Sequence, residues 1–506
     1  MRLGIDFGTT HTVVAAVDRG NYPVITFDEA EALPSLVAVR PADGPLRFGA
    51  EAAALASDPE WHVLRSLKRL LHDAGPETEI ELAGRRLVLL DLVVAQLEHL
   101  RHALRERSNL ELRRGEPLEV AVGVPANASS AQRFLTLEAF RRAGFHPLAL
   151  VNEPSAAGFE YAHRHRTTLT SRREHVVVYD LGGGTFDASL VHMTGGVHEV
   201  VTSAGVTRLG GDDFDAAIAG LVLRKLGRES LVPAQESALL DECRRAKESC
   251  SPNTRRFVVD LAGLGEPPLA LPMDDVSAAC APLVERTLEC LDGVLAASAG
   301  GAVGIDELAG IYVVGGASSF PLVARRLRER FGERRVRRSP HPFAATAIGL
   351  AILLDEAAGY SLSDRLTRHC GVWREEASGR DVRFDPIFPK DTPLPAAGGR
   401  PLEAVRRYRA AHNVGHYRIV ECGRLREGLP EGELLPWSEI RFPFDPALRR
   451  RTRLEGVPVT RLEAEGPRVE ERWRLGPEGA LELRLALPEE GFERRYHLPH
   501  PGRDAA

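Results

Sequence analysis

The chain has 506 residues, enough for about three compact units at roughly 150 residues each, and its length allows a large buried core. Apolar residues make up 43% and charged residues 27%, the proportions of an ordinary globular protein. With 65 Lys and Arg against 71 Asp and Glu, the formal net charge is only -6, which argues against a protein that coats nucleic acid.

The sequence predicts no segment that spans a membrane. Its longest apolar stretch, Leu87 to Leu97, contains Asp91 and is much shorter than the ~20 residues needed to cross a bilayer. Asp6 lies where a signal peptide needs apolar residues, so we expect a cytoplasmic protein. The cysteines form no CxxC pair for zinc or redox chemistry. We expect all of them to be reduced thiols: Cys243, Cys250, Cys280, Cys290, Cys370 and Cys422.

The pattern of the chain changes near residue 360. Before it, β-branched runs alternate with long stretches rich in Leu, Ala and Arg, which predicts an α/β fold with a covered sheet. After it, short alternating runs such as His416 to Val420 and Leu481 to Leu487 are separated by Pro and Gly, which predicts an all-β module. The expected divisions are an α/β domain over 1–355, a short linker over 356–363 and a β domain over 364–500.

The α/β part contains one pattern twice. Leu3 to Val14 has a buried strand that reaches Asp6, one apolar residue, a turn of Gly and Thr, and a second strand. Val177 to Ala188 repeats this plan around Asp180. A single glycine turn commonly just closes a hairpin, but two copies with matched Asp residues favour a functional pair.

These turns have the chemistry of a phosphate site. Glycine lets backbone N–H groups approach an anion because no Cβ is in the way, and Thr hydroxyls add donors. Mg²⁺ is commonly held by one or two carboxylates, waters and substrate phosphates, so Asp6 and Asp180 are expected to share it through waters. The expected phosphate-binding residues are Gly8, Thr9, Thr10, Gly182, Gly183, Gly184 and Thr185.

Other phosphate-binding devices are excluded. No GxxxxGK[ST] motif occurs, and the turn at Gly182 continues into a strand where a dinucleotide-binding turn would open a helix. A third glycine site follows a β run at Gly315 and Gly316, before a helix that has Pro321 in its first turn. Close packing against a flat base and a plain strand-to-helix turn both fit this third site.

Together these segments resemble the nucleotide-binding domain of the DnaK-type heat-shock chaperones, within the wider actin and sugar-kinase ATPase fold. The resemblance runs in the family's order over essentially all of 1–355. It implies a duplicated, ribonuclease H-like fold that binds ATP or ADP with Mg²⁺. The further stretches that carry it are Ser66 to Leu70, Val124 to Ala126, Ala131 to Arg133, Val151 to Ala157, Leu209 to Asp215 and Arg245 to Ser251.

The resemblance implies roles for polar residues of the site. Lys68 would place its ammonium at the γ-phosphate, Glu153 would orient a water on the metal, and Asp187 would help to position the attacking water. The three Thr residues, Thr185 among them, would donate to phosphate oxygens. Simpler interpretations stay open. Lys68 could be an ordinary basic residue on the surface of an amphipathic helix. Glu153 could be a carboxylate at the start of a helix, where the helix dipole favours negative charge.

The nucleoside end is expected to involve the remaining motif residues, with Lys247 and Ser251 four apart on one helix face. Helix-surface positions explain those two equally well. The expected contacts are Gly210, Gly211, Lys247, Ser251, Gly315 and Gly316.

The chain departs from the family at several positions. Arg244 stands where a Glu usually contacts the ribose, Ser319 where an Arg usually stacks on adenine, and His341 replaces an Asp. These changes predict lower affinity for the base. The family's apolar linker, which couples the ATPase domain to the peptide-binding domain, is replaced by Asp355 to Tyr360. Ala149 replaces a basic residue. Both changes bear on stimulation by J-domain proteins.

The last ~140 residues resemble the family's β-sandwich peptide-binding subdomain, chiefly at Pro386 to Pro395. Such a sandwich binds an extended peptide by backbone hydrogen bonds and one apolar pocket; a sandwich without an open groove also fits. The chain ends at Ala506 soon after the last expected strand, so we expect no helical lid and fast release of peptide.

The sequence thus predicts a lidless, ATP-dependent chaperone with slow intrinsic ATP hydrolysis, of the kind that acts in protein folding and stress responses. Its expected partners are unfolded or extended polypeptides, with J-domain and nucleotide-exchange co-chaperones as further candidates, but neither nucleic acid nor membranes. Two alternatives stay open: a nucleotide-gated adaptor with negligible ATPase that binds one protein, and a small-molecule kinase of the same fold.

Overall fold

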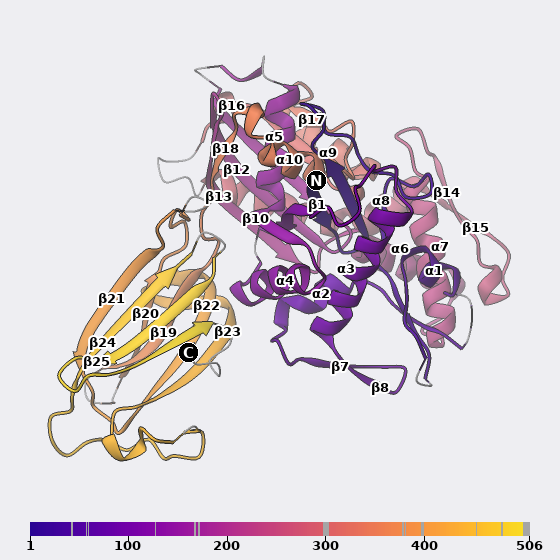
Figure 1. The fold of residues 1–506 in the computed structure, drawn as a ribbon. Helices are drawn as coiled ribbons and strands as arrows, with labels where there is room; N and C mark the ends of the chain where they lie inside the picture. The colour runs from indigo at the N-terminus through magenta and orange to yellow at the C-terminus, as the bar shows by residue number, and fades with distance from the viewer. Residues whose placement is uncertain are drawn as a thin grey trace. The chain divides into compact units, whose positions relative to one another are not determined.

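The computed structural model forms two compact units (Figure 1). Unit 1 comprises Met1–Leu71, Glu77–Asn127 and Leu137–Leu362, and unit 2 comprises His72–Pro76, Ala128–Thr136 and Ser363–Ala506. The structure describes all residues except 42–43, 57, 59, 127, 166–167, 171–172, 297–302, 377–378, 380, 396–398, 452, 477–478 and 499–506; the side chain of Pro233 is likewise not described.

Unit 1 contains two larger sheets built on one plan. In the first, β1 (Arg2–Phe7) pairs antiparallel with β2 (His11–Ala16) and parallel with β9 (Glu119–Val124). In the second, β11 (His175–Leu181) pairs antiparallel with β12 (Thr185–Thr194) and parallel with β16 (Leu308–Val314). The repeated sequence pattern therefore corresponds to a repeated hairpin, and the expected duplicated α/β fold is confirmed.

The remaining strands extend these sheets or form small hairpins. The first sheet has the order β10-β9-β1-β2-β3 and the second β17-β16-β11-β12-β13-β18. The bounds are β3 Leu33–Pro34, β4 Val37–Val39, β5 Arg47–Phe48, β6 His62–Leu64, β7 Glu79–Leu82, β8 Arg85–Val88, β10 His146–Asn152, β13 Val197–Thr207, β14 Arg256–Val259, β15 Leu269–Pro272, β17 Val336–Arg338 and β18 Ser361–Ser363.

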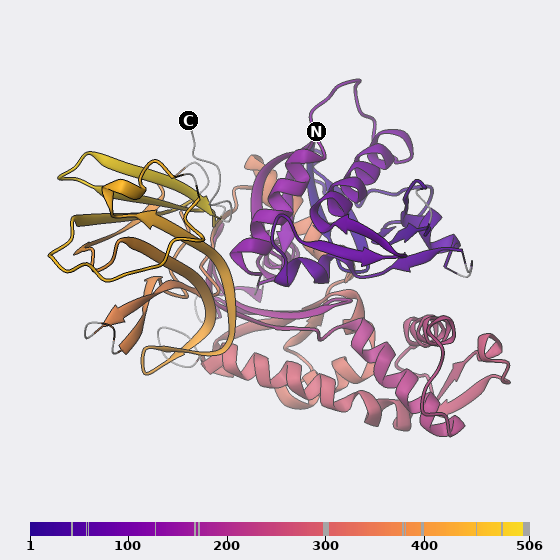
Figure 2. The same cartoon turned by 90° about the horizontal axis from the view of Figure 1, so that it is seen from below.

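Helices cover both sheets. α8 (Met273–Ala296) packs against β12 and β13, as the long helix along the strands in Figure 2 shows. In α3 (Leu89–Glu106), apolar residues recur at helical spacing and are buried on one face. The other helices are α1 Gly49–Ala54, α2 Leu67–Leu70, α4 Ser130–Arg142, α5 Glu153–Arg164, α6 Gly211–Leu226, α7 Pro233–Glu248, α9 Pro321–Phe331 and α10 Ala345–Leu354. No helix among the described residues is long and apolar enough to span a membrane.

Two glycines let α10 pack closely in the centre of unit 1. A Cβ at Gly349 would lie 1.8 Å from the carbonyl oxygen of Ala156 in α5, and a Cβ at Gly4 in β1 would lie 2.2 Å from that of Ala347. Backbone atoms cannot move aside as a side chain can. Contact at this depth therefore requires glycine at both positions.

Gly349→Ala is expected to destabilise the protein by about 3 kcal/mol, because overpacking against a fixed backbone forces the helices apart. Urea unfolding measures this effect. Gly220→Ala in α6 is the matched control, since its Cβ would approach only Arg224 Nη1, at 3.6 Å, and alanine favours a helix. Equal unfolding midpoints for the two variants would contradict the close packing of α5 and α10.

Most of the segment expected to be a short interdomain linker belongs to unit 1. Glu356–Ala358 forms a turn of 3-10 helix, and β18 adds to the edge of the second sheet beside β13. Ser361 donates its backbone N–H to the carbonyl of Gly196 at 3.0 Å. The ring of Tyr360 contacts Phe159 and His198, with centroid distances of 5.9 and 5.3 Å. Unit 1 thus extends to Leu362, beyond the expected domain end.

Unit 2 is an antiparallel β-sandwich, as expected. Its sheets have the orders β20-β19-β22-β23 and β21-β24-β25-β26, and Trp473, Leu483 and Leu485 are fully buried in its core. The alternating runs predicted as strands lie in β22 and β25, whereas Pro477 and Glu478 of the expected turn lie outside the described residues. The bounds are β19 His369–Glu376, β20 Asp381–Phe388, β21 Leu402–Arg409, β22 Val414–Arg426, β23 Leu429–Pro443, β24 Arg468–Leu475, β25 Leu481–Leu487 and β26 Phe492–Leu498.

All six cysteines are free thiols, which confirms that expectation. Cys243 is buried in α7, but Cys250 follows the end of that helix and is only partly buried.

Candidate functional site

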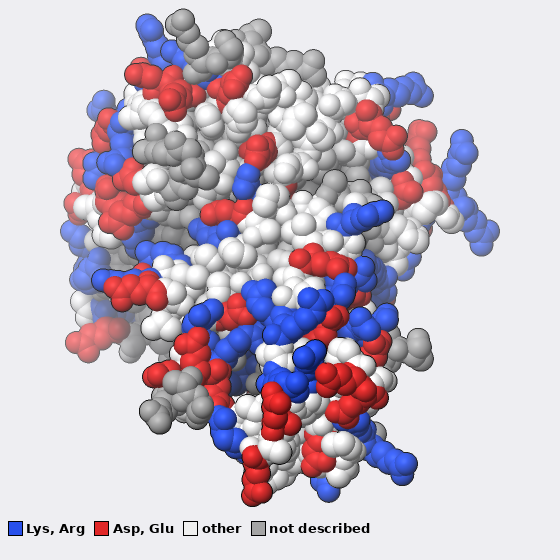
Figure 3. All heavy atoms as spheres, turned by 90° about the vertical axis from the view of Figure 1, so that its left-hand side faces the viewer, with Lys and Arg blue, Asp and Glu red and all other residues white. Residues whose placement is uncertain are grey.

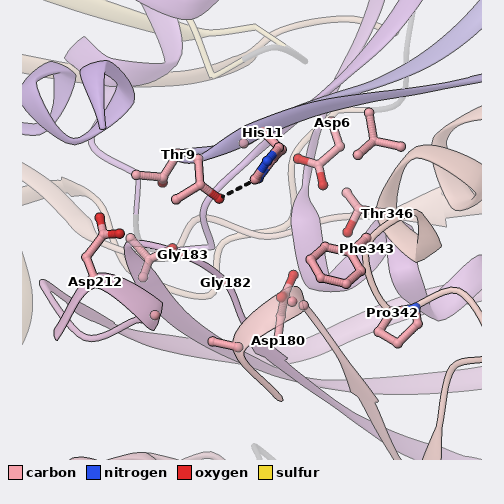
Figure 4. Close-up of a pocket in the computed structure, with 18 of the residues that line it drawn as sticks. Asp6, Thr9, His11, Asp180, Gly182, Gly183, Asp212, Pro342, Phe343 and Thr346 are labelled. Carbon is pink, nitrogen blue, oxygen red and sulfur yellow. Dashed lines mark hydrogen bonds between the residues drawn. The ribbon is translucent and has the colours of Figure 1, made fainter. Parts of the chain in front are cut away.

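The turns of the two repeated hairpins face each other across a cavity in unit 1 (Figure 4). A Cβ at Gly183 would lie 2.4 Å from Thr10 Cγ2, and a Cβ at Gly184 would lie 2.7 Å from Thr9 Cγ2. The glycines therefore allow the two turns to approach one another closely. Backbone N–H groups and Thr hydroxyls are thereby concentrated at one end of the cavity, an arrangement suited to an anion.

Acidic side chains enter the cavity from both sheets. Asp6 lies near the end of β1, Asp180 near the end of β11, and Glu153 is the first residue of α5. All three line the cavity, and Figure 4 shows Asp6 and Asp180 directed into it. The sequence expectation that these two aspartates meet is thus matched by the geometry.

Lys68 is the basic partner of these carboxylates. Its Nζ lies 2.5 Å from Glu153 Oε1, and the two side chains are only 4% and 11% exposed. Burial opposes the charged form of Lys68, but Glu153 and Asp6 nevertheless raise its pKa. Lys68 is therefore a fixed ammonium in the cavity, rather than an exposed residue on a helix surface.

The carboxylates carry more charge than Lys68 offsets. Burial, and then the negative charge of Glu153, raise the pKa of Asp6 to about 7, with Lys68 acting in the opposite direction. Burial and the neighbouring Glu153 and Asp6 also raise the pKa of Asp180 well above its ordinary value. A divalent cation would relieve this repulsion, so the donor set fits Mg²⁺.

The start of α6 packs against the second hairpin. Gly211 N–H donates to the carbonyl of Gly182 at 2.9 Å, and Asp212 N–H donates to that of Gly183 at 2.8 Å. A Cβ at Gly210 would lie 2.6 Å from backbone atoms of Gly183 and Gly184. Gly211 lines the cavity, whereas Gly210 supports the turn from behind.

The wall of the cavity formed by α6 and α7 is strongly charged. Lys247 Nζ lies 2.7 Å from Asp215 Oδ1 and donates to the carbonyl of Gly211 at 2.7 Å. Arg244 contacts Asp212 at 3.1 Å and Asp215 at 3.3 Å. These ion pairs hold both cations against α6, so neither side chain projects freely into the cavity.

The third glycine site completes the cavity wall. Gly315 has φ +82°, and a Cβ there would lie 2.4 Å from Asp180 Oδ1. A Cβ at Gly316 would lie 2.4 Å from Cε1 of Phe343, a residue that is 54% exposed. Close packing against an aromatic ring is therefore one use of Gly316.

Most of the predicted site residues meet at this cavity, although a few lie outside its lining. Asp187 is buried beside Lys68 and contributes to the shift of its pKa. The lining includes Asp6, Gly8, Thr9, Thr10, Lys68, Glu153, Asp180, Gly182, Gly183, Thr185, Gly211, Lys247, Gly315 and Gly316, and it omits Gly184, Asp187, Gly210 and Ser251.

The predicted pairing of Lys247 with Ser251 on one helix face was wrong. α7 ends at Glu248, and Ser251 lies beyond it, exposed, with its hydroxyl 3.2 Å from Thr254 Oγ1. Pro252 explains the early end, because a residue before proline is disfavoured in the α region.

Sequence reasoning missed several lining residues, among them His11, Asp212, Phe343 and Thr346. Asp212 carried a detectable signal, since it follows directly after Gly210 and Gly211 in a motif already identified. Phe343 carried none, because an aromatic residue after a proline looks like ordinary core. The free volume is about 110 Å³, below the ~300–1,000 Å³ typical of small-molecule pockets, and Phe343 forms part of the wall.

Two halves of one plan, with facing glycine turns and carboxylates on one cavity, define a protein of the actin-like ATPase fold class. A family model described as "Hsp70 protein" matches residues 100–363. The chain belongs to the Hsp70 family, which confirms the resemblance to DnaK-type chaperones.

The chain is similar to several proteins named "Chaperone protein HscA homolog". The one from Pseudomonas putida is 35% identical over 377 residues, which cover 71% of this chain and 58% of the relative. The one from Variovorax paradoxus is 33% identical over 378 residues, covering 71% and 58%. The one from Methylococcus capsulatus is 30% identical over 524 residues, covering 98% and 78%. The chain thus spans less than two thirds of the length of the first two relatives.

Proposed function

We propose that this chain is an ATP-dependent chaperone of DnaK type, in which unit 1 binds and slowly hydrolyses MgATP and unit 2 engages extended or unfolded polypeptide. The observation that carries the proposal is the cavity where Asp6, Asp180, Glu153 and Lys68 meet two facing glycine-threonine turns. Family membership supports the same activity, since the members of this family are ATPases.

Different residues of the cavity would bind the metal and the phosphates while the γ-phosphoryl group is transferred to water. Asp6 and Asp180 would hold Mg²⁺ through waters, and the metal would neutralise charge on the β- and γ-phosphates. Backbone N–H groups of both turns, together with the Thr9, Thr10 and Thr185 hydroxyls, would donate to phosphate oxygens. The supporting geometry is their common cavity.

The Lys68–Glu153 pair supports the chemical step. The Lys68 ammonium would stabilise charge that moves toward the leaving oxygen, and Glu153 would accept a hydrogen bond from a positioned water. Asp187, buried nearby, would position the attacking water for in-line displacement. Lys68 and Glu153 line the cavity, whereas Asp187 lies outside its lining.

The nucleoside end is expected to bind more weakly than the phosphate end. Lys247 and Gly211 would face the ribose, with Gly210 supporting the turn from behind, and Gly315 and Gly316 would face the base. Ser319 accepts a hydrogen bond from Arg338, and Arg244 is held by acidic residues of α6. The free volume of the whole cavity is about 110 Å³, so a bound nucleotide would require it to widen.

The expected partners follow from the two units. Unit 2 would bind extended polypeptide segments. Unit 1 would be stimulated by J-domain proteins and would exchange nucleotide with the help of nucleotide-exchange co-chaperones. The cytoplasm is the proposed location. Neither nucleic acid nor a membrane surface is needed for this activity.

The proposal is tested by measuring the ATPase rate with and without a permanently unfolded substrate protein. We expect a slow basal rate that the substrate stimulates several-fold. A basal rate without stimulation would leave the ATPase assignment but remove coupling between the units. No MgATP binding in calorimetry would overturn the proposal entirely.

A second candidate is a nucleotide-gated adaptor with negligible ATPase. The ion pairs that hold Arg244 and Lys247 favour it. A peptide array separates the two candidates. Binding to many extended peptides that ATP weakens supports the chaperone, whereas no peptide binding together with capture of one folded partner supports the adaptor.

A further inference from the structure

Unit 2 contains a larger cavity, of about 1070 Å³, between strands of its two sheets. Residues of β19, β20, β21 and β22 line it, together with loop residues. Within the described part of the chain, the lining holds seven Arg and two His against two Glu and one Asp. Figure 3 shows the corresponding gathering of Lys and Arg over this unit. The cavity, called here the arginine groove, is therefore cationic.

The inner end of the arginine groove already binds carboxylates. Arg406 donates to both oxygens of Asp385, at 2.9 and 3.0 Å, and Arg374 donates to the same carboxylate at 2.6 Å. Arg374 also holds Glu471 with two hydrogen bonds of 2.7 and 3.1 Å. Guanidinium groups match carboxylates in this two-pronged geometry better than any other side chain does.

Aromatic residues form the apolar part of the lining. The hydroxyls of Tyr408 and Tyr417 lie 2.6 Å apart, and both side chains pack into the core of the sandwich. Phe444 packs into the same core, and Arg374 lies over the ring of Tyr408 at 5.6 Å. Tyr408, which is only partly buried, therefore offers an occupant an apolar surface beside Arg374.

The outer arginines are available for a ligand. Arg383 is 64% exposed and contacts Glu376, itself 49% exposed, and such exposed pairs contribute little to stability. Arg407 is 71% exposed and contacts Glu470. Arg418 is exposed on β22. A ligand carboxylate can replace these weak pairs at small cost.

The arginine groove also borders two sheet edges. β20 and β21 each end the strand order of their own sheet. Such an edge strand has backbone N–H and C=O groups that can pair with an added strand. An extended chain can therefore bind by main-chain hydrogen bonds while its alternate side chains reach the arginines.

We propose that the arginine groove selects extended polypeptide segments rich in Asp and Glu, in alternation with apolar residues. This inference rests on the proposed peptide-binding function of unit 2 and deepens it by naming the substrate class. Asp385 and Glu471 show the chemistry of recognition, because both are carboxylates held by groove arginines. The aromatic lining contacts the apolar residues that lie between the acidic residues of the bound peptide.

The test uses the full chain and three fluorescent nine-residue peptides that share Leu at alternate positions and differ only in the other positions: Glu, Gln or Lys. Anisotropy at low salt is expected to give at least 10-fold tighter binding of the Glu peptide than of the Gln peptide. The advantage should shrink as salt rises, because exposed charges are screened. The double variant Arg383→Glu, Arg418→Glu is expected to lose this preference.

The matched control is Arg426→Glu, Arg495→Glu, which reverses two exposed arginines of unit 2 outside the groove and should keep the preference. Equal binding of all three peptides would overturn the inference and leave the proposed function standing. No binding of any peptide would overturn both. Equally tight binding of a single-stranded RNA would show that the groove selects charge without a peptide, which also contradicts the inference.

Discussion

Lys68→Ala is expected to lower the rate of ATP hydrolysis by at least ~100-fold, the loss typical when a fixed charge that stabilises a transition state is removed. Nucleotide binding should stay measurable, because the facing turns and Asp6 and Asp180 are unchanged. The physical reason is the burial of Lys68, which is only 4% exposed beside Glu153, so that water cannot replace its ammonium. Single-turnover hydrolysis and calorimetry with MgADP separate the two effects.

The matched control is Lys225→Ala, which removes a lysine that is 49% exposed and paired with Asp275 on the surface. Its hydrolysis rate should equal that of the unaltered chain. Removing Lys68 also leaves Glu153 buried without its cation, so thermal unfolding with bound MgADP must confirm a folded variant. Unaltered turnover in a folded Lys68→Ala protein would remove Lys68 from the mechanism.

The metal-free protein is expected to lose stability as the pH rises from about 4 to about 7. Asp6 has its pKa raised to about 7 by burial and by Glu153, while the unfolded chain releases that proton near its ordinary value of 3.8. Between these values the folded state holds more protons, so the free energy of unfolding falls with rising pH. Asp180, shifted in the same direction, adds to this fall.

Asp6→Asn should flatten this pH dependence and raise the melting temperature of the metal-free protein at pH 8, because a neutral amide replaces a buried charge. The same variant should weaken binding of MgATP. Mg²⁺ with ATP should stabilise the unaltered chain more at pH 8 than at pH 5.5, since the deprotonated carboxylates hold the metal. Asp292→Asn, at a partly exposed surface pair, is the control. An identical pH profile for Asp6→Asn would contradict the assigned shift.

The repeated hairpins could be predicted because their signal is local. A strand, an Asp, glycines and a second strand lie within about twelve residues, and the folded hairpin uses only those residues. That the two hairpins meet at one cavity could be predicted only because the same pattern, with its Asp, occurs twice in the sequence. The contact of Lys68 with Glu153 joins residues 85 positions apart and was not predicted. The resemblance placed both residues in one site but did not pair them.

Other features had no local signal. β18 is three residues long and pairs through its backbone, so the composition of residues 356–363 resembled a linker. The end of α7 was missed although Pro252 marked it, because the resemblance favoured a longer helix. The arginine groove gathers residues from four strands, and their common orientation follows from the register of both sheets rather than from any sequence motif.

Helix α5 has a mechanical consequence. Its first residue, Glu153, grips Lys68 in the cavity, while Phe159, nearly two turns later, lies against the ring of Tyr360 where the chain leaves toward β18. Gly349 of α10 holds the helix tightly between these points. The first residue of α5 thus lies among the carboxylates, and its middle lies against Tyr360, just before β18. A shift of α5 along its axis would move Glu153 and Phe159 together, and with them both contacts.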